Sequence, residues 1–418
     1  SIYGIVDGLC VSNFVGKTAF AAVNLIMPLP MLLGTIGFML GTGGSAIVGI
    51  TLGEGDQKKA DRYFTLFLLA ALVSVSVLAV LGIVFLRPIA VLLGAKGELL
   101  DYAVRYGRIL MVSLPTFALQ NMFQSFFVTA EKPHLGFWFT VGAGCTNMVL
   151  DVLMVGIWGW GVEGAAIATF ISQLVGGVLP VFYFIDRSNS SRLHLCKTSF
   201  YSKVLRDACI NGSSELMTNL SMSLVNILYN YQLLRLAGEN GVAAYGVIMY
   251  AAFLFVAVFV GYAVGSAPIV SFHYGARNHA EVHNLYRKSL RLIAVVAVTL
   301  TLASMFIIPC VARIFVGYDA ELLALTSRAF RLYALSFLIM GFNVYASSFF
   351  TALGDGVTSA LISFLRTLAF QVIAILLLPL LLGIDGIWLA VTAAELAALA
   401  VSAAMLLTKD KVFHYRKA

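Results

Sequence analysis

Apolar stretches of about 20 residues or more recur along the whole chain, and this feature limits the possible folds most strongly. A helix of that length crosses the roughly 30 Å hydrocarbon core of a bilayer. Of the 418 residues, 60% are hydrophobic and 11% are charged, whereas a soluble domain carries about 25% charged residues. Strands of a membrane barrel would be shorter and would alternate in polarity. The sequence therefore predicts an all-α polytopic membrane protein.

The apolar stretches divide into twelve predicted membrane helices, the first of which is visibly short. They cover approximately residues 1–16, 20–50, 64–86, 105–128, 135–157, 162–185, 207–236, 242–274, 290–316, 328–352, 357–382 and 386–407. The segments GEGDQKKADRY and GARNHAEVHNLYRK occupy equivalent loops, and their amphipathic pattern predicts surface helices that lie along the membrane.

The two halves of the chain repeat each other, with a constant offset of 222 in the residue numbers. Six helices therefore occur twice in the same direction, which predicts two six-helix lobes related by an axis along the membrane normal. We expect an N-lobe at residues 1–185, a basic cytoplasmic linker at 186–206 and a C-lobe at 207–418. Ser1 aligns with Ser223, so the segment Tyr201–Met222 has no counterpart in the first half. We therefore expect that the start of the first helix and its lead-in precede this sequence. Matching residues include Gly16 and Gly238, Gly43 and Gly265, Asn121 and Asn343, and Gly164 and Gly386.

Basic residues concentrate in alternate loops, with 17 in one set of loops and 9 in the opposite set. The positive-inside rule places the richer set, and with it both chain ends, in the cytoplasm. This topology accounts for the net charge of +7, and no basic soluble module indicates nucleic-acid binding. The five cysteines show no metal-ligand spacing and indicate no disulfide framework.

One acidic residue, Asp151, lies within the apolar stretch NMVLDVLMVGIWGWGVEGAAIAT, where a carboxylate costs roughly 2.5–3.5 kcal/mol to insert. Asn147 precedes it by four residues and shares its helix face. A rise of about 1.5 Å per residue puts a polar set at one level in the outer half of the N-lobe, with Tyr106 above it. The members of this set are Asp7, Asn147, Asp151 and Thr169.

This polar set predicts a cation-coupling site. Two carboxylates in an apolar pocket cannot comfortably both be ionised, so they share a proton or bind a cation such as Na⁺ together with the amide and hydroxyl oxygens. The alternative is a helix–helix hydrogen bond that only stabilises the bundle. At the equivalent positions of the second half, 222 residues later, none of these polar residues is retained. This difference favours a coupling role that is confined to the N-lobe. The replacements are Tyr229, Ala369, Ile373 and Val391.

Further polar residues are predicted inside the membrane. Asn121 and Asn343 are expected to line a cavity towards the cytoplasm. Glu215 is the best candidate for a carboxylate that attracts cationic substrates, and Arg366 is a second charged candidate for the cavity. Glu395 is also predicted to be buried, and pairing among these charges in a structural role is an equal alternative.

Three segments carry a resemblance to a known family: IVDGLCVSNFVG, NMVLDVLMVGIWGWGVEGAAIAT and VGSAPIVSFHYGARN. They resemble the multidrug and toxic compound extrusion (MATE) family, in particular its bacterial branch with an aspartate in the first helix. The resemblance implies an antiporter in the bacterial inner membrane that exports bulky, often cationic, organic compounds in exchange for H⁺ or Na⁺. It also implies that the protein acts as a monomer without a cofactor other than the coupling ion. The family's coupling residues carry over to Asp7, Tyr106, Asn147, Asp151 and Thr169.

Two other functions are weighed against this one. A lipid-linked oligosaccharide flippase of related fold should line its cavity with several basic residues, but Arg366 stands against at least three intramembrane carboxylates. A membrane enzyme is not expected, because no HExxH, paired-His or Ser/His/Asp arrangement is present. Neither the substrate nor the choice between H⁺ and Na⁺ follows from the residues.

Overall fold

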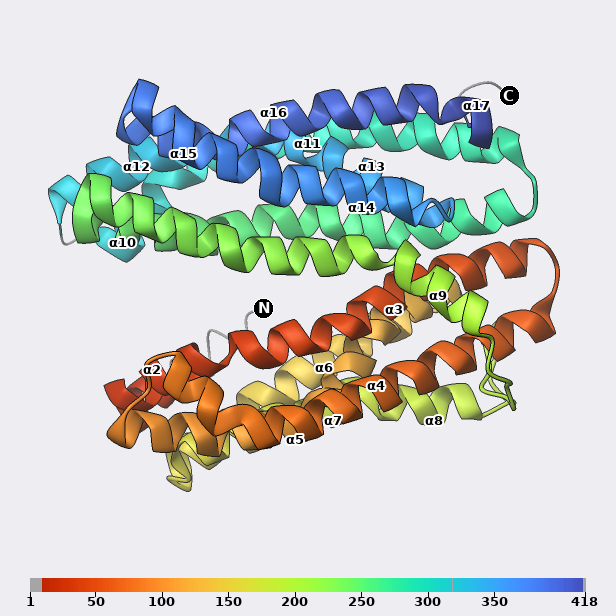
Figure 1. Ribbon diagram of the computed structural model, residues 1–418, viewed down its shortest axis with the longest axis horizontal. Coiled ribbons are helices and arrows are strands. Elements are labelled where there is room, and N and C mark those ends of the chain that lie inside the picture. The colour runs from red at the N-terminus through yellow and green to blue at the C-terminus, as the bar shows by residue number, and fades with distance from the viewer. Residues whose placement is uncertain (1–9, 318, 416–418) are drawn as a thin grey trace. The chain divides into compact units, whose positions relative to one another are not determined.

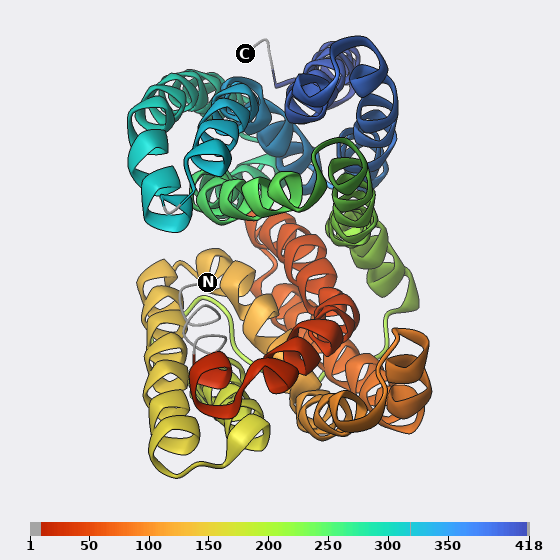
Figure 2. The ribbon, with the colours of Figure 1, turned by 90° about the vertical axis from the view of Figure 1, so that its left-hand side faces the viewer.

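The computed structural model describes residues 10–317 and 319–415, and this part of the chain is helical with no strand. The chain forms two compact units, called the N-lobe and the C-lobe from here on. The N-lobe runs to Gly212, except that Leu52–Gly55 groups with the C-lobe, which otherwise begins at Ser213. Figure 1 shows the helices of each lobe along their length, and Figure 2 shows them nearly end-on.

In the N-lobe, α5 packs between α4 and α7, and α7 in turn packs against α6 (Figure 1). An irregular segment, residues 186–201, connects α8 to α9. The elements are a π-helical turn η1 (Val11–Val15), α2 (Lys17–Ile26), α3 (Pro28–Gly53), α4 (Gln57–Leu92), α5 (Gly97–Thr129), α6 (Pro133–Asp151), a second π-helical turn η2 (Val152–Ile157), α7 (Gly161–Gly177), α8 (Leu179–Ile185) and α9 (Ser202–Asn211).

In the C-lobe, α10 packs against α13, α13 against α14 and α15 against α16. The helix α10 is broken at Gly238, which has φ 60° and ψ −150°, so it forms two consecutive membrane helices. The elements are α10 (Ser213–Gly275), α11 (His279–Val316), α12 (Ala320–Ala334), α13 (Phe337–Ala352), α14 (Gly356–Phe364), a π-helical turn η3 (Leu365–Ala369), α15 (Phe370–Leu382), α16 (Ile384–Thr408) and α17 (Asp410–Phe413).

Within the described residues, eight helices are long and apolar enough to cross a membrane, or nine if α12 and α13, which meet at 46°, form one bent span. The helix α5 is also long, but Gln120, Asn121 and Gln124 make its second half more polar. The first arm of α10 is similarly rich in Ser and Asn. With these two, the described residues contain five of the six predicted helices of the N-lobe and all six of the C-lobe, while most of the predicted first helix, residues 1–16, lies outside the described residues.

The backbone confirms the parallel repeat. Left-handed φ values occur at Gly16 and Gly238, at Gly55 and Arg277, and at Gly161 and Gly383, and each pair has the offset that the sequence predicts. The helix N-caps repeat as well, because Asp56 accepts a hydrogen bond from the backbone N–H of Lys59, and Asn278 accepts one from that of Glu281. Turns and caps therefore recur at equivalent positions in the two lobes.

These caps correct one expectation about the basic loops. Because Asp56 caps a helix that continues without a break to Leu92, the segment QKKADRY forms the first turns of α4. The equivalent segment begins α11 at His279 in the same way. The prediction of separate surface helices in these loops is therefore wrong.

Close packing of α3 on α5 gives a testable prediction. A Cβ atom on Gly37 would lie 2.3 Å from the backbone oxygen of Ala118, so Gly37→Ala should lower the free energy of unfolding by ~1–3 kcal/mol through overpacking. Gly142→Ala is the matched control, because a Cβ there meets nothing within 4 Å. Thermal unfolding in detergent checks this, and equal stability of the two variants would contradict the packing.

Candidate functional site

The predicted coupling residues of the N-lobe come from three helices that pack together. Asn147 and Asp151 occupy the last turns of α6, and both side chains are fully buried. Thr169 lies on α7 and is 7% exposed, and Tyr106 lies on α5 and is fully buried. Asp7 falls outside the described residues.

Two of these side chains are in direct contact. The Asn147 Nδ2 amide donates to Thr169 Oγ1 over 3.4 Å, which links α6 to α7. Asn147 Oδ1 is buried and accepts no hydrogen bond from any group in the described ranges 10–317 and 319–415. A buried acceptor without a donor is costly unless a ligand occupies it. The amide oxygen of Asn147 is therefore available to a cation or to a protonated partner.

An apolar cluster adjoins the polar residues on one side. Tyr106 packs in a buried group with Val155, Val162 and Ala165. Val155 is four residues beyond Asp151 along the chain, so the cluster lies about one turn past the carboxylate. The surroundings of Asp151 are therefore of low polarity. In such surroundings the charged form of a carboxyl group is much less stable than its neutral form.

The backbone changes its winding at Asp151. The helix α6 ends at this residue, and Val152–Ile157 continue as a π-helical turn. Such turns are rare and occur frequently at functional sites. Sequence reasoning missed this turn, because hydropathy carries no signal for a change from i+4 to i+5 hydrogen bonding.

The equivalent helix of the C-lobe has its π turn at a different position. Its own π turn, η3, covers Leu365–Ala369, which corresponds at the repeat offset to residues 143–147, before Asp151 rather than after it. A π turn contains one residue more than an α-helical turn, so the residues after it face a different side of the helix. Accordingly, Ile373, the counterpart of Asp151, is 52% exposed.

The oxygen atoms of this site suit a proton or a hard cation. A carboxylate, an amide carbonyl and a hydroxyl, from Asp151, Asn147 and Thr169, are ligands of the kind that such cations prefer. No group of three or more His, Cys, Asp or Glu residues with metal-binding geometry occurs in the described part of the chain.

The predicted cavity residues lie elsewhere in the two lobes. Asn121 on α5 is 6% exposed, and its Nδ2 atom has no hydrogen-bond partner within the described residues. In the C-lobe, Arg366 donates through Nε to Glu395 Oε1 at 2.8 Å. Asn343 Nδ2 donates to Glu395 Oε2 at 2.7 Å. Glu215, on α10, lies within electrostatic reach of Arg366.

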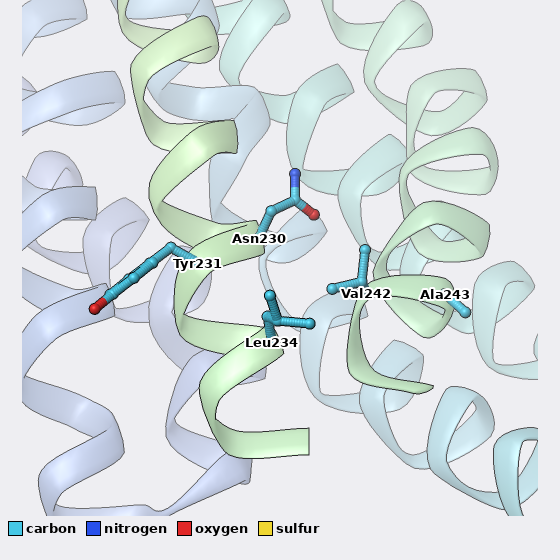
Figure 3. Close-up of a pocket in the computed structure, with 5 residues that line it drawn as sticks. All are labelled: Asn230, Tyr231, Leu234, Val242 and Ala243. Carbon is cyan, nitrogen blue, oxygen red and sulfur yellow. The ribbon is translucent and has the colours of Figure 1, made fainter. Parts of the chain in front are cut away.

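A pocket lies beside the break of α10 at Gly238 (Figure 3). Asn230 and Leu234 precede the break, and Val242 and Ala243 follow it, while the Tyr231 side chain points away from that pair. None of these residues carries a charge at neutral pH. The pocket therefore does not add to the candidate cation site.

Membrane helices that repeat in parallel and carry buried polar groups are typical of polytopic membrane transporters. The MatE family model matches residues 1–153 and 216–377. The chain belongs to this family of MATE transporters.

Curated relatives and solved structures agree with this assignment. The Multidrug export protein MepA of Staphylococcus saprophyticus is 21% identical, over 98% of this chain and 90% of the relative. MepA of Staphylococcus aureus strain MSSA476 has the same identity and coverage. A MATE crystal structure in complex with MaL6 covers 100% of this chain and 93% of its own, with 23% identity and a TM-score of 0.92. An outward-facing multidrug resistance MATE transporter of the MOP superfamily shows 24% identity, the same coverage and a TM-score of 0.92.

The contact between Asn147 and Thr169 can be measured. Thr169→Val leaves a buried amide without its acceptor, and Asn147→Leu leaves the hydroxyl without its donor, so each should destabilise the protein by ~1–3 kcal/mol. The double variant removes both partners and should cost less than the sum by ~0.5–1 kcal/mol. Unfolding in detergent provides the double-mutant cycle, and strictly additive losses would show that the contact contributes nothing.

Proposed function

We propose that the protein is a cation-coupled antiporter that exports bulky, often cationic, organic compounds across the cytoplasmic membrane by alternating access. The names of the MepA relatives support the export of drugs. The excess of basic residues in alternate loops supports cytoplasmic chain ends. The coupling ion is H⁺ or Na⁺, and its site is the N-lobe group around Asp151.

The observation that carries this proposal is the complete burial of Asp151 beside an amide oxygen without a donor and a hydroxyl group. A permanent charge in such a place is costly, whereas a carboxyl group that binds a proton or Na⁺ is neutralised. The free energy of the site therefore changes greatly with occupancy. A site of this kind can bias the lobe between two conformations, provided that they bind the cation with different affinity.

The transport cycle follows from this difference. A cation that enters from outside binds at Asp151 together with Asp7, which lies outside the described residues, and offsets one negative charge of the pair. The helices that carry the site then shift relative to one another, and the organic compound leaves on the outer side. The membrane potential adds about 2.3 kcal/mol per charge for every 100 mV to the inward movement of the cation.

The flippase alternative is not favoured. Arg366 is the one intramembrane arginine that the sequence offers for a pyrophosphate group, and its Nε atom is already bound by Glu395. A pyrophosphate would have to displace a fully buried carboxylate from this arginine.

Efflux of a fluorescent organic cation from membrane vesicles tests the proposal, with the proton gradient and the Na⁺ gradient imposed separately. Asp151→Asn should lower the coupled rate by more than tenfold, because an amide neither binds a proton nor supplies a charged ligand, and about 2.3 kcal/mol per charge is lost for every 100 mV. The variant should still be inserted and folded, because the amide has the shape of the acid.

The matched control is Glu163→Gln on the neighbouring helix α7. Its carboxylate is 51% exposed and pairs with Arg105 at 3.9 Å, so it is a carboxylate outside the buried site. We expect normal coupled efflux from this variant. Normal efflux from Asp151→Asn would contradict the proposal, and loss of Asp151→Asn from the membrane would assign Asp151 a structural role instead.

A further inference from the structure

One face of the first arm of α10 carries a row of polar side chains. Its members are spaced by four, three and four residues, so they lie on one side of the helix. All are at least partly exposed, and the row extends over about 16 Å at a rise of roughly 1.5 Å per residue. The four residues, called the amide stripe from here on, are Asn219, Ser223, Asn226 and Asn230.

The hydrogen bonds of the amide stripe stay within its own helix. Asn219 Nδ2 donates to the backbone oxygen of Glu215 at 2.8 Å, and Ser223 Oγ donates to that of Asn219 at 3.3 Å. Asn230 Nδ2 donates to the backbone oxygen of Asn226 at 3.0 Å and lies 3.3 Å from Asn226 Oδ1. Because the Nδ2 atoms of Asn219 and Asn230 are turned towards the helix backbone, their carbonyl oxygens are turned away from it. The stripe therefore offers hydrogen-bond acceptors to a ligand.

The opposite face of the same arm has polar groups that do hold the lobe together. Tyr229 Oη donates to the backbone oxygen of Ile387 on α16 at 3.3 Å. Gln232 Nε2 donates to that of Ile375 on α15 at 3.5 Å. Both side chains are buried. Within residues 10–317 and 319–415, the amide stripe makes no comparable bond to another helix, so helix packing does not account for it.

Contact with lipid does not account for the amide stripe either. Polar side chains in membrane helices face the bundle interior or a water-filled cavity as a rule, because hydrocarbon satisfies none of their hydrogen bonds. The scaffold does not require these amides, since Asn226 and Asn230 correspond to Gly4 and Gly8 at the repeat offset. The stripe is therefore a surface of the C-lobe that faces water and is available to a ligand.

Apolar surface borders the amide stripe. Met222, Ile227 and Leu234 flank it and are 59%, 69% and 57% exposed. At its end, Asn230 and Leu234 line the pocket of Figure 3, and Val242 lines the other side of it. The pocket has apolar walls and a volume of about 510 Å³, within the range of roughly 300–1,000 Å³ that is usual for sites of small organic molecules.

These features fit one kind of occupant. A positively charged N–H group is the strongest partner for a row of neutral carbonyl oxygens, and the apolar pocket suits a hydrocarbon body. Glu215, the predicted attractor of cationic substrates, precedes Asn219 by one turn on the same face. A quaternary ammonium or phosphonium ion has no N–H group and cannot donate to the stripe.

We propose that the amide stripe binds the N–H groups of protonated amines and makes the protein prefer them over organic cations that have no N–H group. The charged N–H group donates to the carbonyl oxygens of the stripe, while the apolar part of the compound occupies the pocket beside Asn230. The inference rests on the proposed export of organic compounds and specifies their chemical class. It concerns the selection of the compound and is separate from cation coupling at Asp151.

Calorimetric titration of the purified protein in detergent tests the proposal at one fixed pH and Na⁺ concentration. The probes are imipramine, a tertiary amine that is protonated at neutral pH, and N-methylimipramine, its quaternary analogue. Imipramine should bind about tenfold more tightly, because only its ammonium group donates a hydrogen bond. Asn230→Leu removes an acceptor at similar volume and should weaken the binding of imipramine by about tenfold, while that of N-methylimipramine changes less than about twofold.

The matched control is Asn24→Leu on α2. Asn24 is also an exposed helix amide, and its Nδ2 atom donates to the backbone oxygen of Phe20, four residues earlier, at 2.9 Å. This variant should keep the preference for imipramine. Asn219→Leu, at the other end of the amide stripe, is the second variant and serves if Asn230→Leu does not fold.

Equal affinity of the unsubstituted protein for the two compounds would overturn the proposal. A parallel loss of both affinities in the stripe variants would assign the amides a structural role and would overturn it as well. An equal loss of preference in Asn24→Leu would show that the effect is not specific to the stripe. The affinity ratio is measured without an ion gradient, so it can fail while coupled efflux stands. Absence of binding of either compound would contradict the proposed function as well.

Discussion

The burial of the Asp151 carboxyl group among apolar helices is the constraint on which the account of the N-lobe depends. A charge at this position is expensive in a bilayer-spanning bundle. The carboxyl group lies one helical turn beyond Asn147, which bonds Thr169, and the helix changes its winding immediately after it. In the function proposed above, the free energy of this arrangement depends on whether a cation neutralises the carboxyl group, so the N-lobe is built around a group whose state changes.

The two lobes share their scaffold but differ in their buried polar groups. Left-handed turns and helix caps recur at equivalent positions of the repeat. The buried acid of the N-lobe has an exposed isoleucine, Ile373, as its counterpart, while the buried Glu395 of the C-lobe has Gln173. Duplication thus supplied the helices, and each lobe carries polar residues of its own. The displaced π turns η2 and η3 contribute to this difference, because they rotate equivalent helices at different points.

Much of the architecture could be predicted from the sequence. Hydropathy locates the membrane helices because every backbone polar group in a bilayer must be satisfied within a helix. Glycines at fixed spacing reveal the repeat, since the left-handed turns at Gly16 and Gly238 tolerate few other residues. The meeting of Asn147 and Thr169 follows from the helical rise alone.

Other features could not be predicted in this way. The π turns depend on tertiary packing. Glu395 on α16 binds Asn343 on α13 and Arg366 on η3, and the position of Arg366 depends in turn on the π turn that contains it. Four buried hydroxyl groups hydrogen-bond to one another between α13 and α14, and their four-residue spacing is visible in the sequence: Ser347 and Thr351, and Ser359 and Ser363. However, Ser and Thr in helices usually bond to their own backbone, so the spacing alone did not indicate a connected chain.

In the proposed transport cycle the organic compound leaves after the cation binds, so cation occupancy of the N-lobe site and binding of the organic substrate should exclude each other, and this is the central claim of the proposal. Equilibrium binding of a fluorescent organic cation to the purified protein in detergent, measured across pH and Na⁺ concentration, tests this claim most directly. The account predicts that affinity falls as pH decreases or as Na⁺ increases, and that this dependence flattens in Asp151→Asn. An affinity that is indifferent to both ions in the unsubstituted protein would contradict it.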